Sequence, residues 1–145
     1  MSPGWGPKHP FFAATVQLDQ DLMAYPWSVQ QWLETSLPTY SIFHTSAAGE
    51  LQGFALYQLS EVEKLAHLLK IAVLSDLRGS EVTRSFWETQ VVTLRARGFE
   101  RVYLEVAKNN GPAIGFYRKH GFKLLHEIKG FYKDGQNAIT MELAI

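Results

Sequence analysis

One stretch of the chain combines residue types that could bind an anion. Residues 68–73 are an apolar run, residues 77–80 (Leu-Arg-Gly-Ser) are turn formers, and a run with helical spacing begins near Glu81. A strand, a turn and a helix start in this order aim free backbone N–H groups and the positive end of the helix at one point. A pyrophosphate group suits such a site, although an ordinary strand-to-helix connection can have the same residues.

Several other kinds of chemistry lack their residues. The chain has no nucleophile elbow, no phosphate-binding loop with Lys-Ser/Thr and no Gly-x-Gly-x-x-Gly sequence. It contains no cysteine, which excludes a disulfide, a thiolate nucleophile and a cysteine zinc site. None of its five histidines has metal-ligand spacing to another, so we expect no metal, and His67 is expected to be only a strand residue.

The charges favour a small anionic ligand over a nucleic acid. Fourteen Lys and Arg balance fourteen Asp and Glu, which leaves no bulk attraction for a polyanion. Residues 1–62 carry a net charge of −4 and residues 63–145 carry +4, a bias that suits a phosphorylated cofactor. No apolar run is long enough to span a bilayer and the first residues do not resemble a signal peptide, so we expect a cytoplasmic protein without membrane contact.

The elements that position these residues can be predicted from their spacing. A chain of 145 residues that is 46% hydrophobic predicts a single domain over residues 1–145, with residues 1–10, rich in Gly and Pro, as an irregular arm or poor edge strand. Ser28 and Gln31 match a capping box. The expected helices cover residues 12–22, 28–37, 81–97 and 112–120, and the expected strands cover 40–45, 51–59, 65–73, 101–106, 122–129 and 138–144.

This order of elements predicts an α/β (α+β) fold with a mixed, mostly antiparallel sheet and helices on both faces. The strand over residues 101–106 alternates cleanly: Val102, Leu104 and Val106 share one face. Tyr103 and Glu105 lie on the other face, which is therefore the less apolar one.

Several short motifs in the right order carry a family resemblance. They are Ile71-Ala72-Val73, Leu104-Glu105-Val106 followed by Asn110, Ala113-Ile114-x-x-Tyr117-x-x-x-Gly121-Phe122, Phe131-Tyr132, and Ala138-Ile139-x-Met141-x-Leu143. From Tyr25 to its C-terminus the chain resembles the GNAT acetyltransferases. Within them it is most similar to the bacterial branch that acetylates the N-terminal alanine of a small-subunit ribosomal protein.

The resemblance implies a twisted sheet whose central strand pair splays apart, with the pantetheine arm of acetyl-CoA between the two strands. It assigns Ile71, Ala72 and Val73 to that arm. The pyrophosphate turn has the family pattern Gln/Arg-x-x-Gly-x-Gly/Ala, and Glu81 and Thr83 stand where the pattern has its small residues. The turn residues implied to bind the cofactor are Arg78, Gly79, Ser80, Glu81, Val82, Thr83 and Arg84.

The resemblance also implies catalytic and acceptor-binding residues. Glu105 matches the family's proton acceptor, and Tyr117 matches its proton donor and contacts the cofactor. Asn110 matches a further cofactor contact, but it also suits a turn before Pro112. The residues expected to bind the acceptor are Tyr25, Trp27, Phe131 and Tyr132, while Lys70 stands where the closest relatives tend to have Asn.

The expected activity is transfer of an acetyl group from acetyl-CoA to a protein N-terminal α-amine by direct attack, without a metal and in a monomer or weak dimer. Two alternatives remain open. The altered turn suits a non-catalytic GNAT-fold protein that binds a partner through a degenerate acetyl-CoA site. The acceptor could also be a lysine side chain or a small-molecule amine instead of a protein N-terminus.

Overall fold

The computed structural model describes residues 5–34, 39–77 and 81–145. The predicted order of helices and strands is confirmed. The helices are α1 (Phe12–Leu22), α2 (Val29–Glu34), α3 (Glu81–Ala96) and α4 (Gly111–Lys119), with a short 3-10 helix η1 (Ser75–Leu77) before α3. The strands are β1 (Thr39–Thr45), β2 (Leu51–Ser60), β3 (Leu65–Val73), β4 (Arg101–Ala107), β5 (Lys123–Ile128) and β6 (Ala138–Ala144).

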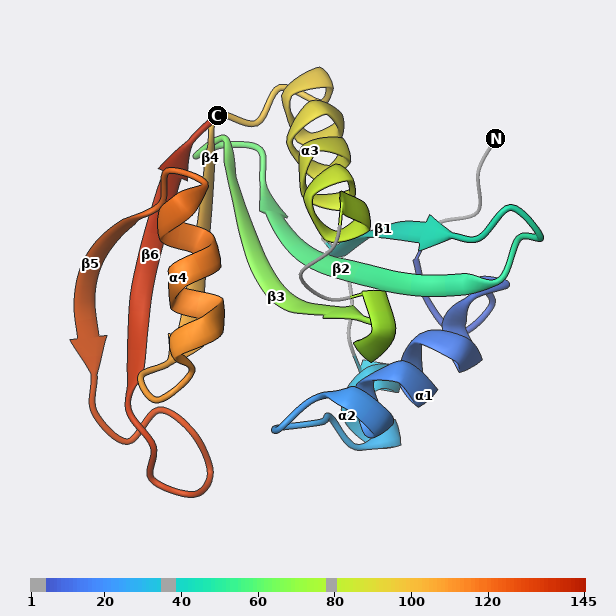
Figure 1. Cartoon of the computed structure of the whole chain (residues 1–145), viewed down its shortest axis with the longest axis horizontal. Helices are drawn as coiled ribbons and strands as arrows, with labels where there is room; N and C mark the ends of the chain where they lie inside the picture. The colour runs from blue at the N-terminus through green and yellow to red at the C-terminus, as the bar shows by residue number, and fades with distance from the viewer. Residues whose placement is uncertain (1–4, 35–38, 78–80) are drawn as a thin grey trace.

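The six strands form one twisted sheet in the order β1-β2-β3-β4-β6-β5 (Figure 1). Every neighbouring pair is antiparallel except β3 and β4, which are parallel. The predicted fold class, a mixed and mostly antiparallel sheet, is therefore confirmed. The single parallel pair is possible because α3 provides the crossover between β3 and β4.

The local signals in the sequence explain where two helices begin and end. Ser28 Oγ accepts a hydrogen bond from the Gln31 N–H at 3.1 Å, and Gln31 Oε1 accepts one from the Ser28 N–H at 2.8 Å, which is the predicted capping box at the start of α2. The expected end of this helix, near Leu37, lies outside the described residues. Gly121 follows α4 with a φ of +95°, a conformation that a residue with a side chain adopts only with strain.

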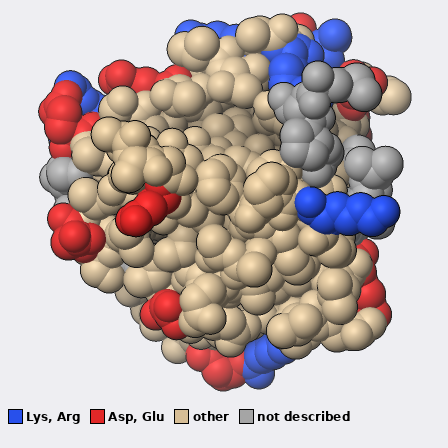
Figure 2. Space-filling view, turned by 90° about the vertical axis from the view of Figure 1, so that its right-hand side faces the viewer, with Lys and Arg blue, Asp and Glu red and all other residues tan. Residues whose placement is uncertain are grey.

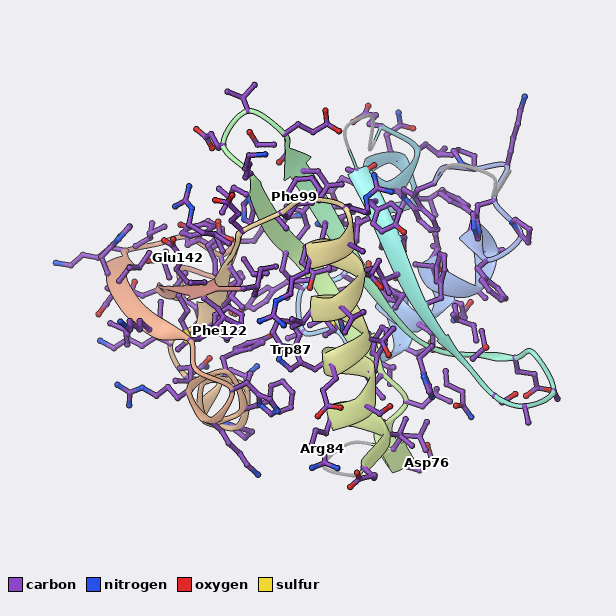
Figure 3. The ribbon with its side chains drawn as sticks, turned by 90° about the horizontal axis from the view of Figure 1, so that it is seen from above. Asp76, Arg84, Trp87, Phe99, Phe122 and Glu142 are labelled. Atoms are coloured by element: carbon purple, nitrogen blue, oxygen red, sulfur yellow. The ribbon has the colours of Figure 1, made fainter. Side chains whose placement is uncertain are left out.

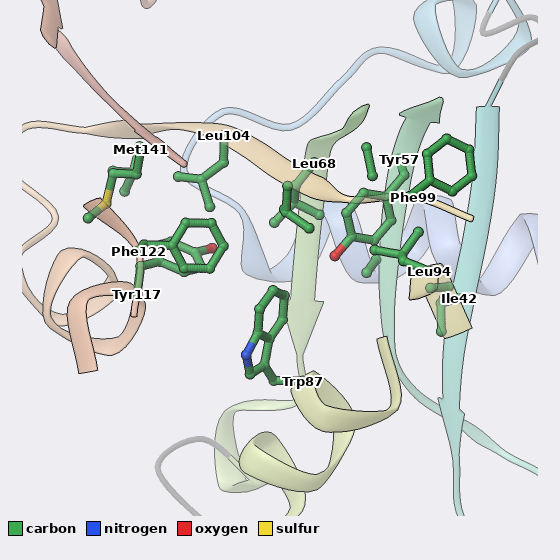
Figure 4. Close-up of a cluster of buried hydrophobic side chains, with 14 of the residues drawn as sticks. Ile42, Tyr57, Leu68, Trp87, Leu94, Phe99, Leu104, Tyr117, Phe122 and Met141 are labelled. Carbon is green, nitrogen blue, oxygen red and sulfur yellow. The ribbon is translucent and has the colours of Figure 1, made fainter. Parts of the chain in front are cut away.

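Helices cover both faces of the sheet, as predicted, and each face has its own core. The larger core packs α3 and α4 against the sheet through side chains that include Trp87, Leu94, Leu104, Tyr117 and Phe122 (Figure 4). The smaller core packs α1 and α2 against β2 and β3 on the opposite face, through Leu18, Trp32, Phe54, Leu56 and Ala72.

The central strands β3 and β4 separate after a short contact. They pair from Leu65 with Arg101 to Leu68 with Leu104, yet β3 continues to Val73 and β4 to Ala107. Beyond Leu68, β3 pairs with β2, and β4 pairs with β6 along its whole length. The two strands therefore open a gap between them at their C-terminal ends, which is the predicted splay.

The N-terminal segment packs on the smaller core. Residues 5–11 form bends and turns, and the Trp5 ring lies 6.0 Å from the Trp32 ring and 5.8 Å from the Phe43 ring. Figure 2 shows the side of the molecule where the β1–β2 loop lies. The charged side chains on this side lie mainly around its edge and few lie at its centre. This side is remote from β5 and β6 (Figure 1). Within the described residues, no helix combines the length and apolar character needed to cross a bilayer.

Candidate active site

Glu105 lies where β3 and β4 begin to separate, one residue beyond the last residue of β4 that pairs with β3. Its neighbours Leu104 and Val106 belong to the larger core, so its carboxylate points to the opposite face. There Glu105 Oε2 lies 2.7 Å from His67 Nε2 of β3. The Glu105 side chain is 15% exposed and that of His67 is 27% exposed. A carboxylate at the mouth of the gap is suited to accept a proton from a bound amine.

Tyr132, in the loop between β5 and β6, lies near this carboxylate. The pKa of Tyr132 is raised to about 12. Burial is the largest cause, followed by the charge of Glu105 and the neighbouring Tyr25. The ring of Tyr25 stacks on that of Tyr132 with 4.3 Å between the centroids. The Tyr25 hydroxyl donates a hydrogen bond to Asp134 Oδ2 at 2.9 Å. The α1–α2 loop and the β5–β6 loop therefore meet beside Glu105.

Tyr117 of α4 approaches the same region from the other face of the sheet. It is buried in the larger core, and its ring lies 5.3 Å from that of Phe122 (Figure 4). Burial raises the pKa of Tyr117 well above its usual range, and the nearby Tyr132 contributes in the same direction. Tyr117 therefore keeps its proton at all physiological pH values and can donate a hydrogen bond.

A buried ion pair anchors the loop that carries Tyr25 and Trp27. Lys70 Nζ of β3 lies 2.8 Å from Asp19 Oδ1 of α1, and both side chains are almost fully buried. Lys70 also donates to the Tyr25 carbonyl at 3.1 Å, and its Nζ lies 4.9 Å from the centre of the Trp27 ring. Asp19 Oδ2 accepts from the Trp27 N–H at 2.8 Å. The pair thus fixes the backbone of residues 25–27.

The residues expected around the cofactor lie on β3 and at the start of α3. Ile71, Ala72 and Val73 form the part of β3 that continues after its pairing with β4 ends. Arg78, Gly79 and Ser80 lie outside the described residues. Thr83 Oγ1 donates to the Leu77 carbonyl at 2.9 Å, and Val82 lies beside it, half-buried in the first turn of α3.

Two charged residues at the start of α3 pair with each other. Glu81 and Arg84 form an ion pair, and Arg84 Nε also lies 3.9 Å from Glu88 Oε1. The Glu81 side chain is 77% exposed. Figure 3 shows Arg84 at this end of α3, on the outer side of the helix, whereas Trp87 points inward toward Phe122. The charge of Glu81 is therefore balanced on the outer surface of the helix.

Asn110 and Phe131 have simpler surroundings. The Asn110 side chain caps α4 by accepting from the Ala113 N–H at 3.2 Å. Phe131 is 45% exposed, and its ring meets that of Tyr132 edge-on at 5.0 Å. Among the described residues, no three His, Cys, Asp or Glu side chains are arranged to hold a metal ion.

The structure thus brings four of the expected residues together: Glu105, Tyr132, Tyr25 and, from the opposite face, Tyr117. Reasoning from the sequence missed His67 and Asp19, which are the polar partners of Glu105 and Lys70. Each pair joins residues far apart in the chain, and only the register of the folded strands and helices reveals it.

Comparisons with known proteins agree with this geometry. The profile of the Acetyltransferase (GNAT) family matches residues 9–122. The N-alpha-acetyltransferase of Saccharolobus solfataricus is 34% identical over 91 residues, which are 61% of this chain and 54% of that protein. The chain thus spans only about half the length of that relative. The ribosomal protein bS18-alanine N-acetyltransferase of Salmonella typhimurium is 30% identical over 135 residues, 91% of this chain and 90% of that one.

A solved structure matches over the whole length of the chain. The crystal structure of the ribosomal-protein-S18-alanine N-acetyltransferase from Escherichia coli superposes with a TM-score of 0.83 and 27% sequence identity. The match covers 100% of this chain and 94% of that one.

Proposed function

The chain belongs to the GNAT acetyltransferase family, and from this premise we propose that it transfers an acetyl group from acetyl-CoA to the α-amine at a protein N-terminus. The observation that carries the proposal is the position of Glu105, at the mouth of the β3–β4 gap and beside Tyr132. The names of the two relatives, an N-alpha-acetyltransferase and a ribosomal protein alanine N-acetyltransferase, support this class of acceptor. A ribosomal protein with N-terminal alanine is the first acceptor to try.

The residues present suit acetyl-CoA. Ile71, Ala72 and Val73 lie where β3 no longer pairs with β4, so backbone groups on that side of β3 can pair with an extended arm as a strand would. Glu81 does not oppose a phosphate at the start of α3, because its carboxylate pairs with Arg84 and is exposed. This pairing weakens the argument for a degenerate cofactor site. Bound acetyl-CoA would supply the acetyl group as an activated thioester.

Glu105 would prepare the acceptor. A peptide α-amine has a pKa of about 8 and is mostly protonated at neutral pH, so it must lose a proton before it can attack. The Glu105 carboxylate, only 15% exposed, would accept that proton directly or through one water molecule. Tyr132 keeps its hydroxyl proton because its pKa is raised to about 12, and it can therefore donate a hydrogen bond to the acceptor's backbone.

Tyr117 would assist the leaving group without giving up its proton. A thiol has a pKa of about 8.5, far below the raised pKa of the buried Tyr117 phenol. Complete proton transfer from the phenol to a thiolate would therefore be unfavourable. A hydrogen bond from Tyr117 to the departing sulfur stabilises the charge that develops there while the phenol stays neutral.

The test measures release of coenzyme A with a thiol reagent, which reads only the product because the chain contains no cysteine. Two peptides of otherwise equal sequence serve as acceptors: one has a free N-terminal alanine and no lysine, and the other has an acetylated N-terminus and one lysine. We expect acetylation of the first peptide, with the modified atom located by mass spectrometry. Exclusive modification of the lysine peptide or of a small amine would contradict an N-terminal acceptor.

A pair of matched variants tests the role of Glu105. We expect Glu105→Gln to lower kcat by about 10²–10⁴-fold, the usual loss when a general base is removed. Glu142→Gln is the control, because Glu142 is a partly exposed carboxylate on neighbouring β6 that pairs with Arg101 at 2.9 Å. Equal activity of the two variants would contradict the role of Glu105. Calorimetric titration of acetyl-CoA into each variant shows whether cofactor binding is retained.

A further inference from the structure

Lys70 lies on β3 directly before residues 71–73, and its side chain leaves the strand toward α1. The register between β2 and β3 shifts here: Leu56 lies opposite Lys70, whereas Tyr57 lies opposite Leu68. β3 therefore has one extra residue, Leu69, at this point. Leu68 belongs to the larger core, and strict alternation would place Lys70 on the same face. The extra residue turns the lysine to the opposite face of the sheet.

The ammonium group of Lys70 is bound by residues on the acceptor side of the sheet. Its Nζ lies 2.8 Å from Asp19 Oδ1 and donates a hydrogen bond to the Tyr25 carbonyl at 3.1 Å. It also lies 4.9 Å from the centre of the Trp27 ring. The side chains of Lys70 and Asp19 are almost fully buried, so water does not compete for these contacts. Two of the three partners are residues expected to bind the acceptor.

Two other contacts of the loop that carries Tyr25 and Trp27 are exposed. The Tyr25 hydroxyl donates to Asp134 Oδ2 at 2.9 Å, and Gln20 Nε2 donates to the Trp27 carbonyl at 2.6 Å. An exposed hydrogen bond contributes little to the position of a loop, because water can replace either partner. The buried contact from Lys70 to the Tyr25 carbonyl therefore holds the loop backbone more firmly than these two do.

We infer that Lys70 is a positioning residue that aligns the acceptor amine with the acetyl group. This inference rests on the proposed function. The backbone of Lys70 continues directly into residues 71–73, the segment proposed to hold the pantetheine arm, while its side chain holds the loop proposed to hold the acceptor. Direct attack needs the reacting atoms about 3–3.5 Å apart, and a displacement of about 1 Å can reduce the rate about a hundredfold. Lys70 itself exchanges no proton and forms no bond to either substrate.

The test measures KM for both substrates in a variant that lacks the ammonium. Lys70→Met keeps an unbranched side chain without a donor, and Asp19→Asn in the same protein removes the carboxylate charge that would otherwise remain unpaired. We expect this double variant to raise KM for the alanine peptide by about tenfold or more and to lower kcat, while KM for acetyl-CoA stays within about twofold of the parent value. Partial unfolding alone would lower the apparent kcat but leave KM for the peptide unchanged.

A second ion pair provides the matched control. Arg101 Nη1 of β4 lies 2.9 Å from Glu142 Oε1 of β6, and Arg101→Met with Glu142→Gln removes a pair of the same charges away from the acceptor loop. We expect both KM values to stay unchanged in this control. Urea denaturation shows whether each variant is folded. Lys70→Met alone serves if the double variant does not fold, because Asp19 still accepts from the Trp27 N–H.

The outcomes separate this inference from the proposed function. An unchanged KM for the peptide in a folded Lys70 variant, with an active parent protein, would overturn the role of Lys70 alone. An equal rise in KM for the peptide and for acetyl-CoA would also overturn it, because the change would then disturb β3 as a whole. A parent protein that acetylates neither peptide would overturn the proposed function, and this inference with it.

Discussion

The buried carboxylate of Asp19 holds three separate parts of the chain together. It is fully buried, and its two oxygens accept from Lys70 Nζ at 2.8 Å, the Trp27 N–H at 2.8 Å and Trp32 Nε1 at 2.9 Å. Burial lowers the pKa of Lys70, and the hydrogen bond and charge of Asp19 act against that shift. The carboxylate therefore keeps a buried ammonium charged and at the same time fixes the loop that carries Tyr25.

We predict that Asp19→Ala lowers the free energy of unfolding by about 3–5 kcal/mol, because it leaves a buried ammonium without a counter-charge. Urea denaturation measures the change. Asp21→Ala is the control: Asp21 is exposed on the same helix and accepts a hydrogen bond from the exposed Gln17 side chain, so we expect a loss below about 0.5 kcal/mol. Adding Lys70→Met to Asp19→Ala removes the stranded charge and should recover part of the loss. Equal losses from both aspartate variants would contradict this account.

The residues of the site were only partly predictable. Alternation along residues 101–106 placed Glu105 on the less apolar face, and the family resemblance drew attention to Tyr117 and Tyr132. The partners of Glu105 and Lys70 lie 38 and 51 positions away in the chain. Such pairs depend on which strands are neighbours and in which register, and a single sequence carries no direct signal for either.

At the scale of elements, α4 depends on the residue that precedes it. The Asn110 side chain accepts from the Ala113 N–H at 3.2 Å, and proline follows within the first turn of the helix. This cap satisfies one of the N–H groups that the first turn leaves without a helical partner. If Asn110 also contacts the cofactor, it must do so while its side-chain oxygen still accepts the hydrogen bond from the Ala113 N–H.

We predict that Asn110→Ala lowers the free energy of unfolding by about 1 kcal/mol, the usual effect of losing an N-cap. Asn110→Ser keeps a capping oxygen and should retain most of the stability. Measuring acetyl-CoA affinity in both variants separates the two roles of this side chain. If Asn110→Ala unfolds at the same urea concentration as the parent protein, the cap contributes nothing to stability.

The elements themselves were the most predictable level of structure. Apolar spacing over residues 81–97 gave α3, and the capping box of Ser28 and Gln31 gave the start of α2, because both signals act over a few neighbouring residues. The order of the strands in the sheet was not available from such local signals. The position of the gap, after Leu68 and Leu104, depends on the register between strands and emerged only from the folded chain.

At the scale of the whole molecule, tyrosines whose pKa is raised link stability to alkaline pH. Burial is the first cause that raises the pKa of Tyr57, Tyr117 and Tyr132, the last to about 12. In the unfolded chain a tyrosine ionises near pH 10. Above that pH the folded protein binds more protons than the unfolded chain, so its stability decreases as pH rises. The pKa of Lys70 is lowered from its ordinary value of 10.5, so its contribution has the opposite sign. It makes the folded state more stable as pH rises, and it does so only below about pH 10.5.

We predict that these tyrosines leave the free energy of unfolding unchanged up to about pH 10. Between about pH 10 and about pH 12 each tyrosine should lower it by up to roughly 1.4 kcal/mol per pH unit. Urea denaturation at a series of pH values, followed by circular dichroism, measures this slope. Tyr132→Phe should make the decrease shallower because it removes one of the tyrosines whose pKa is raised. A slope that is the same in Tyr57→Phe, Tyr132→Phe and the parent protein would show that other groups drive alkaline unfolding.

The gap between β3 and β4 also gives the sheet two edges in its interior. A sheet edge is a template for any extended chain, whether a pantetheine arm or a stretch of peptide, because backbone pairing does not depend on side chains. Ligand specificity must then come from side chains at the rim of the gap, where Glu105 and the stacked rings of Tyr25 and Tyr132 lie. We therefore expect the opening of the sheet to accept extended molecules in general, and the side chains around it to determine which of them binds.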